Sequence, residues 1–252
     1  SDFLIDDLSK NTEWIKALKG IKVVFHLAGR AHILKKSSKN SYEKFEKNNH
    51  HATKKLIEDA YKAGVKRIIF LSTIKVNGEK TLKGIPFNQN SKNNPQDSYA
   101  LSKLKAEDEL IKASKKNNIE ITIIRIPLVY GPGVKANFLK LIDLVYKKIP
   151  LPFGSINNLR SLIYIENLVD FLYVCAENEN AKNQIFILSD PYPISTTKLI
   201  KIVANVMKIK PIFLPIPKII LRIIFFFLGK SDIINKLILS LEIDPKFAYQ
   251  TL

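Results

Sequence analysis

Three short apolar runs, separated by segments with helical spacing, constrain the fold of this chain more than any other feature. The runs are VVFHLA (Val23–Ala28), RIIFLST (Arg67–Thr73) and ITIIRIPLVYG (Ile121–Gly131). Strands that are apolar on both sides are typical of a parallel sheet with helices on both faces. Helical spacing marks Tyr42–Ala63, and a further apolar run, QIFIL, begins at Gln184. The sequence therefore predicts an α/β fold with a doubly wound parallel sheet, in which ligands bind beyond the carboxyl ends of the strands.

The chain is strongly basic, with 40 Lys and Arg against 23 Asp and Glu and a net charge of +17. Such a charge can indicate binding to nucleic acid or to a membrane surface. The lysines are spread along the chain, and no basic patch is interleaved with aromatic residues. We therefore expect no nucleic-acid partner and attribute the charge to compositional bias, although a cationic surface would attract an anionic substrate.

The most apolar stretch is IILRIIFFFLG (Ile219–Gly229). A membrane span needs about 20 apolar residues, so we expect no span, and we favour a buried helix over an interfacial membrane helix. The single cysteine, Cys175, excludes an intramolecular disulfide and suits a reducing compartment, which predicts a cytoplasmic protein.

The stretch SYALSKLKAEDEL places Tyr99 and Lys103 four residues apart, just after Asp97 or Ser98 as a helix cap. Residues at i and i+4 share a helix face, and an ammonium beside a phenol lowers the phenol's pKa from about 10. A tyrosine of this kind can transfer a proton near neutral pH. The competing interpretation is a solvated helix face, because about one Tyr-x-x-x-Lys pair is expected by chance in so lysine-rich a chain.

Five motifs, in their order and spacing, resemble the extended short-chain dehydrogenases/reductases: FHLAG, FLSTIKVNGE, SYALSK, RIPLVYGPGVKANF and RSLIYIENLVD. The resemblance is to the nucleotide-sugar epimerase/dehydratase branch and covers nearly the whole chain. Within that branch, STIKVNGE and PLVYGPGVKANFLKL are similar to UDP-N-acetylquinovosamine-type 4-ketoreductases, which are often labelled UDP-glucose 4-epimerase-like. The resemblance implies a Rossmann-like fold, an NAD or NADP cofactor and a UDP-sugar substrate.

The resemblance also implies a catalytic set. Tyr99 corresponds to the catalytic tyrosine, Lys103 to the lysine that tunes it and holds the nicotinamide ribose, and Thr73 to the residue whose hydroxyl binds the reacting sugar oxygen. When a hydride moves between a nicotinamide and a sugar carbon, the oxygen on that carbon needs a proton partner and a hydrogen-bond donor. Tyr99 and Thr73 meet these two needs.

Two binding sets follow from the same resemblance. The residues implied to bind the cofactor are Asp7, Leu8, Leu27, Ala28, Gly29, Asn49, Ser72, Tyr99 and Lys103. The residues implied to bind the substrate are Thr73, Asn137, Phe153 and Arg160. Arg160 and Asn137 would bind the diphosphate, and Phe153 would pack against uracil. Taken one at a time, each has a structural alternative, such as a surface cation, a helix cap or a core aromatic residue.

The remaining candidates have structural interpretations. We expect His26 to be structural and Arg125 to form an ion pair. His50 and His51 are adjacent, so on an α-helix they would point about 100° apart, and no metal site is predicted.

The chain also departs from the family pattern. The Gly-x-x-Gly-x-x-Gly loop is absent, so we expect a fragment of a longer enzyme, truncated at both ends. Residues 1–134 would form a partial NAD(P)-binding core, and residues 135–252 the remaining core elements and an incomplete, smaller substrate-binding region. No acidic pair follows Thr73, which disfavours sugar dehydration.

The resemblance therefore predicts oxidoreduction at C4 of a UDP-sugar in surface-polysaccharide precursor synthesis. We favour 4-keto reduction over 4-epimerisation. A non-catalytic dinucleotide-binding regulator of the same fold is the alternative from another class. A homodimer is possible.

Overall fold

A four-stranded parallel sheet forms the centre of the computed structural model, which describes residues 3–4, 8–9, 11–31, 39–82, 84–134 and 136–252, without the side chains of 39–41, 136 and 137. Its strands are β1 (Val23–His26), β2 (Arg67–Thr73), β3 (Glu120–Ile126) and β6 (Gln184–Ile187), in the order β1-β2-β3-β6. The register pairs His26 with Phe70, and Thr73 with Ile126. The predicted parallel α/β fold is confirmed.

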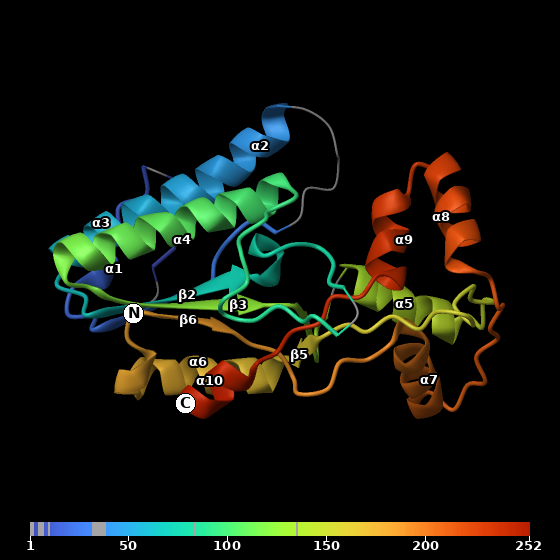
Figure 1. Cartoon of the computed structure of the whole chain (residues 1–252). Coiled ribbons are helices and arrows are strands. Elements are labelled where there is room, and N and C mark those ends of the chain that lie inside the picture. Colours follow the sequence, from blue (N-terminus) through green and yellow to red (C-terminus); the bar gives the residue numbers. More distant parts are fainter. Residues whose placement is uncertain (1–2, 5–7, 10, 32–38, 83, 135) are drawn as a thin grey trace.

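Helices cover both faces of this sheet (Figure 1). One face carries α3 (Ala52–Lys62) and α4 (Ser98–Asn117), with α1 (Ile15–Leu18) and α2 (Lys39–Phe45) beside them; the other carries α6 (Ile165–Glu177) and α10 (Lys246–Thr251). Successive residues of β2 alternate between the two cores: Phe70 packs with Leu110 of α4, and Ile69 packs with Phe171 of α6. This burial on both sides explains why the strand sequences show no polar alternation.

The helix predicted over Tyr42–Ala63 contains a turn of a different kind. Between α2 and α3 the chain forms a π-helical segment, η1 (Glu46–His51). Thr53 donates a hydrogen bond from its hydroxyl to the carbonyl of Asn49 at 2.5 Å. Single π-helical turns inside helices frequently occur at functional sites.

The third predicted strand, Ile121–Gly131, is split at Pro127. Proline has no N–H to donate to a neighbouring strand, so β3 ends at Ile126 and a separate strand, β4 (Leu128–Tyr130), follows. Strand β4 leaves the main sheet and pairs in parallel with β5 (Leu162–Tyr164).

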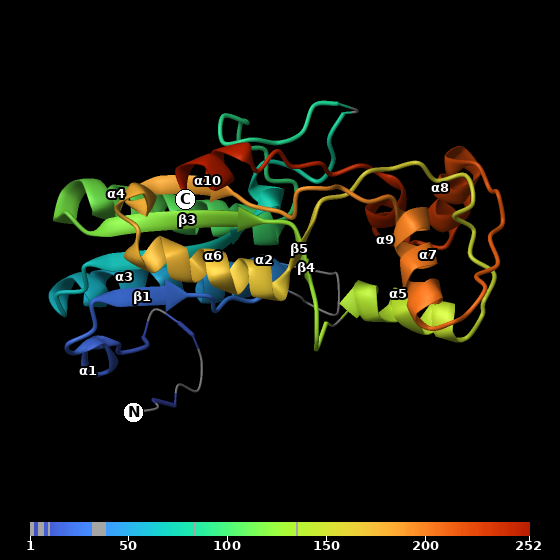
Figure 2. The same cartoon turned by 90° about the horizontal axis from the view of Figure 1, so that it is seen from below.

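A helical lobe lies at one end of the sheet (Figure 2). It comprises α5 (Ala136–Tyr146), α7 (Thr196–Val206), α8 (Lys218–Phe227) and α9 (Ser231–Ile238). Its core includes Val145, Ile200, Leu221 and Ile234. The division at residue 135, into a cofactor-binding core and a range with the remaining core elements and a substrate-binding region, stays a prediction. In that second range, α6, β6 and α10 lie with the sheet.

The expectation of a buried helix at Ile219–Gly229 is wrong. Leu221 is the buried residue of α8, and the other face of the helix is exposed. The reason is that α8 lies at the outer end of the lobe, where no further layer of the described chain covers it (Figure 1). Among the described residues, no helix is both long and apolar enough to cross a membrane.

Candidate active site

A cavity of about 1690 Å³ lies where the carboxyl ends of β2 and β3 face the helical lobe. Its lining contains most of the predicted site residues: Leu27, Gly29, Ser72, Thr73, Tyr99, Lys103, Phe153 and Arg160. A pocket for one small molecule is typically about 300–1,000 Å³, so this cavity has room for a cofactor and a substrate together.

Tyr99 enters the cavity from the first turn of α4. Asp97 caps this helix by accepting a hydrogen bond from the Ala100 N–H at 2.7 Å. Burial raises the pKa of the Tyr99 phenol, and this outweighs the opposing effects of Lys75 and the nearby Thr73 side chain. The expectation that Lys103 lowers this pKa is therefore wrong for the structure: the phenol is mostly buried, and the cation that acts on it is Lys75.

Lys103 instead faces β1 and β2. Its Nζ lies 3.8 Å from the centroid of the Phe70 ring. Burial lowers the pKa of Lys103 to about 7, although Glu107 opposes this shift. A Cβ placed on Gly29 would lie 3.8 Å from the same Nζ, so the ammonium sits beside the bare backbone that follows β1.

The backbone after β1 is held by Asn49 of η1. Asn49 Oδ1 accepts a hydrogen bond from the Arg30 N–H at 2.8 Å, and its Nδ2 donates to the Arg30 carbonyl and to Ser102 Oγ at 3.0 Å each. A Cβ on Gly29 would lie only 3.2 Å from Asn49 Oδ1, so a larger residue would press on this arrangement. Asn49 thus positions the segment that borders the cavity.

His26 anchors the same region from the sheet. Its Nε2 lies 2.8 Å from Thr53 Oγ1. Burial, and then the charge of Lys103, lower the pKa of His26 to about 3, so the imidazole is neutral at physiological pH. These contacts agree with the predicted structural role.

A buried ion pair lies under the cavity floor. Arg125 on β3 contacts Glu107 on α4 at 2.6 Å, which confirms the ion pair predicted for Arg125. Ser72 donates its hydroxyl hydrogen to the same carboxylate. Asn77 Oδ1 accepts a further hydrogen bond from Arg125 at 3.1 Å. Ser72 therefore lines the cavity while it is fixed from below.

Lys75 is a site residue that the sequence analysis missed. Its Nζ contacts Asp97 and lies 2.7 Å from Glu79 Oε1, and all three residues line the cavity. No carboxylate was expected near Thr73, but folding brings these two acids close and pairs both with Lys75. The i, i+4 spacing of Lys75 and Glu79 was a visible signal. The contact between Lys75 and Asp97 could not be seen in the sequence, because it depends on how the loop between Glu79 and Asp97 folds back.

Comparison with known proteins agrees with this geometry. Residues 2–188 match the model of the NAD dependent epimerase/dehydratase family. The chain belongs to this family. It is a family of NAD-dependent enzymes, and it is the one that the motifs predicted.

Relatives of this epimerase/dehydratase chain include named enzymes. It is 41% identical to the UDP-glucose 4-epimerase of Vibrio cholerae, over 99% of this chain and 76% of that protein. It is 28% identical to the N-acetyl-alpha-D-glucosaminyl-diphospho-ditrans,octacis-undecaprenol 4-epimerase of Escherichia coli O157:H7, over 67% of this chain and 51% of that protein. The fold is similar to that of the Bacillus cereus UDP-glucuronic acid 4-epimerase solved with UDP-glucuronic acid and NAD, with a TM-score of 0.76, 22% identity, and coverage of 96% of this chain and 72% of that one.

On the substrate side of this family member, Arg160 and Phe153 both line the cavity. Burial lowers the pKa of Arg160 to about 10, so the guanidinium stays charged at neutral pH, and its Nη1 donates to the Leu239 carbonyl at 3.1 Å. Phe153 is largely buried in the core of the helical lobe, so its packing against uracil stays a prediction.

The other predicted residues are placed less directly. Ala28 is exposed between the cavity-lining residues Leu27 and Gly29. Leu8 does not line the cavity, and its carbonyl accepts a hydrogen bond from Asn48 at 2.6 Å. Asp7 and the side chain of Asn137 lie outside the described residues.

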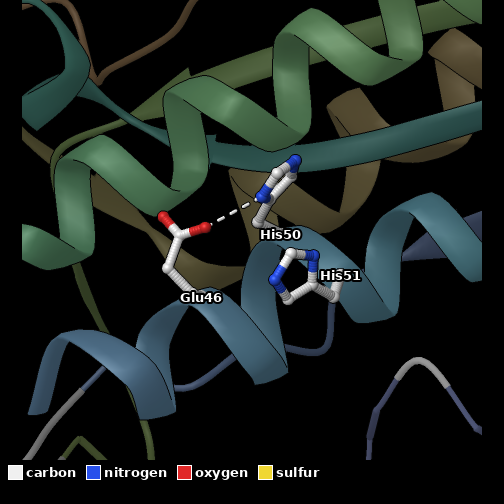
Figure 3. A group of neighbouring side chains, drawn as sticks. All are labelled: Glu46, His50 and His51. Carbon is white, nitrogen blue, oxygen red and sulfur yellow. Dashed lines mark hydrogen bonds and ion pairs between the residues drawn. The ribbon is translucent and has the colours of Figure 1, made fainter. Parts of the chain in front are cut away.

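Glu46, His50 and His51 form a cluster on η1 (Figure 3). The centroids of the two imidazole rings lie 4.8 Å apart, and the ring planes are inclined by 31°. Glu46 Oε2 pairs with His50 Nδ1 at 2.9 Å, and Oε1 pairs with Lys105 Nζ at 2.8 Å. These pairs account for both carboxylate oxygens, and the absence of a metal stays a prediction.

Proposed function

We propose that this chain carries out NAD(P)-dependent oxidoreduction at C4 of a UDP-sugar. The observation that carries the proposal is the convergence of Tyr99, Thr73 and Lys103 on one cavity that also contains Arg160. The substrate class is supported by the relative named UDP-glucose 4-epimerase and by the fold shared with a UDP-glucuronic acid complex.

The residues after β1 fit a dinucleotide. Gly29 leaves bare backbone beside the Lys103 ammonium, and Asn49 fixes the segment that follows. Lys103 would bind the ribose hydroxyls, and Leu27 and Gly29 would border the nicotinamide. The cofactor, when bound, supplies the hydride acceptor or donor. NAD is favoured because solved relatives are NAD complexes.

Tyr99 and Thr73 would then act on the C4 oxygen. When C4 is oxidised, the hydroxyl loses its proton to Tyr99; when C4 is reduced, Tyr99 returns a proton to the oxygen. The Thr73 hydroxyl donates a hydrogen bond to that oxygen in both directions. Arg160 would bind the diphosphate, which is remote from the reacting carbon.

Between the two reactions at C4, we favour 4-keto reduction. The motifs STIKVNGE and PLVYGPGVKANFLKL, which are similar to those of 4-ketoreductases, support this choice. The second candidate is 4-epimerisation, which the name of the 41% identical relative favours. A role in surface-polysaccharide precursor synthesis and a homodimer remain parts of the proposal.

Product analysis separates these functions. The enzyme is incubated with a UDP-4-keto-hexose and NADH, and separately with UDP-glucose and catalytic NAD, and the sugars are identified by NMR. A reductase oxidises one NADH for each ketone consumed, whereas an epimerase interconverts the two UDP-hexoses with no net change in NADH. Cofactor binding without turnover of either substrate would instead support the non-catalytic regulator.

A further inference from the structure

Helix α8 presents an apolar face to solvent. The large apolar residues in and directly after it, each between 42% and 82% exposed, are Ile219, Ile220, Ile223, Ile224, Phe226, Phe227 and Leu228. Single exposed apolar residues are ordinary on a protein surface, but a contiguous patch marks an interaction site. A helix of ten residues is about 15 Å long, so α8 is far too short to cross a bilayer.

The patch continues into a groove between α8 and α9. This groove has a volume of about 550 Å³ and is lined by Ile219, Ile223, Phe226 and Phe227 from α8, with Ile234 from α9. The two helices stand side by side at the outer end of the lobe (Figure 1). The groove therefore belongs to the same outward-facing surface as the exposed residues.

The charged residues on and beside α8 are basic, namely Lys218, Arg222 and Lys230, and the first acid after them along the chain is Asp232 in the first turn of α9. The segment 191–231 contains no Asp or Glu. The basic residues of the same segment are Lys198, Lys201, Lys208, Lys210, Lys218, Arg222 and Lys230. An apolar helix face in basic surroundings is typical of helices that lie in the headgroup region of an anionic membrane.

We propose that α8 and the adjoining groove dock onto the surface of an anionic lipid bilayer. The phenylalanines and isoleucines of α8 would enter the boundary between headgroups and acyl chains, and Lys218 and Lys230 at its two ends would contact lipid phosphates. A protein partner with an acidic rim is the competing occupant. The membrane is favoured because Lys218, Arg222 and Lys230 give the exposed apolar helix a basic charge, which complements an anionic lipid surface.

Docking would bring the membrane close to the active-site cavity. Arg222 and Asn235 line both the α8–α9 groove and the large cavity that contains Tyr99. The docked enzyme would therefore hold the lobe end of its cavity near the headgroups. The docking itself does not depend on the reaction at C4.

Vesicle flotation tests the proposal without any measurement of turnover. The protein is mixed with vesicles of phosphatidylcholine alone, or of phosphatidylcholine with phosphatidylglycerol, at low and high salt. We expect flotation with the anionic vesicles and a marked loss at high salt, because screening weakens surface electrostatics. We expect little flotation with phosphatidylcholine alone.

Two double variants locate the contact. Phe226→Ser/Phe227→Ser removes two of the exposed rings and should lower the partition coefficient for anionic vesicles at least about ten-fold, since each buried CH₂ contributes about 0.8 kcal/mol. The matched control, Tyr61→Ser/Leu82→Ser, removes two exposed apolar residues outside the lobe and should float like the wild type. Circular dichroism and the thermal midpoint establish that both variants are folded.

Three results would overturn the proposal. The first is a wild type that does not float with anionic vesicles. The second is equal flotation of the wild type and the phenylalanine variant. The third is a wild-type dimer that the phenylalanine substitutions convert to a monomer, with no flotation of either form, because the face would then be an interface between copies of the chain.

Discussion

The side chain of Asn49 hydrogen bonds both the N–H and the carbonyl of Arg30, at 2.8 and 3.0 Å. Asn49 lies on the π-helical turn η1, and Arg30 directly follows the cavity-bordering segment after β1. The position of that segment is therefore set by an irregular turn of a helix on the face of the sheet.

The hydrogen bonds between Asn49 and Arg30 predict that a variant without the Asn49 side chain binds the cofactor more weakly. Asn49→Ala removes both hydrogen bonds to Arg30, each worth about 1 kcal/mol, so the Kd for NADH should rise roughly ten-fold or more. Asn167→Ala is the control, because Asn167 bonds Asp190 at 2.8 Å, away from the cavity lining. Fluorescence titration with NADH measures both variants. An equal Kd in both would contradict the role given to Asn49.

Tyr99→Phe should lower kcat at least about a hundred-fold, because in the proposed mechanism it removes the group that exchanges a proton with the C4 oxygen. The thermal midpoint should change little. Tyr249→Phe removes a phenol that donates to the Ser189 carbonyl at 2.6 Å and should leave kcat unchanged. Steady-state kinetics of the wild type and both variants measure this effect. An unchanged kcat for Tyr99→Phe would show that Tyr99 has no catalytic role.

Arg160→Leu should raise the KM for the UDP-sugar about ten- to a hundred-fold, as expected for the loss of a charge-assisted hydrogen bond of about 1.5–3 kcal/mol. The kcat should change less, because the diphosphate is bound in both the ground state and the transition state. Arg160→Lys keeps the charge and should lose less affinity. If the KM of folded Arg160→Leu equals that of the wild type, the diphosphate is bound elsewhere.

Replacing only one partner of the Arg125–Glu107 ion pair is predicted to lower the stability of the fold. Both side chains are at most 5% exposed, so Arg125→Met leaves a buried carboxylate without its cation. The free energy of unfolding should fall by about 3–5 kcal/mol. Arg125→Met/Glu107→Leu should lose less than the single variant, and urea titration of the two compares them. A larger loss in the double variant would mean that the pair itself is strongly stabilising.

The lowered pKa of His26 predicts that the free energy of unfolding depends on pH. Its pKa falls from 6.5 in the unfolded chain to about 3 in the fold, so between these values the unfolded state binds more protons. Stability from this residue is complete above pH 6.5 and is lost as the pH falls toward 3, by on the order of 3 kcal/mol between pH 7 and pH 4. His26→Gln should show a smaller loss in urea titrations at these two pH values. Identical losses would exclude His26 as a source of acid sensitivity.

Much of the fold and site followed from local patterns. The strand predicted at Arg67–Thr73 has the same bounds in the structure, and Asp97 caps the helix of Tyr99 as expected. Other features depend on contacts between distant segments. The π-helical turn is accompanied by the tertiary hydrogen bonds of Asn49, and the effect of Lys75 on Tyr99 depends on a loop that folds back.

Two errors had different origins. Pro127 is a recognised interruption of strands, so the split between β3 and β4 could have been predicted from the sequence. The exposure of α8 could not have been predicted, because an apolar helix has the same sequence pattern whether it packs against protein or against a lipid surface. Its surroundings in the lobe had to be known first.

The way the chain passes between the sheet and the helical lobe limits how the two can be separated. The described chain crosses between them four times: from β4 to α5, from α5 to β5, from β6 to α7, and from α9 to α10. No single cut would release the lobe as a module, and a graft onto another scaffold would need four matched junctions. Specificity in such an architecture is therefore more readily altered by exchanging side chains around the cavity than by swapping the lobe as a block.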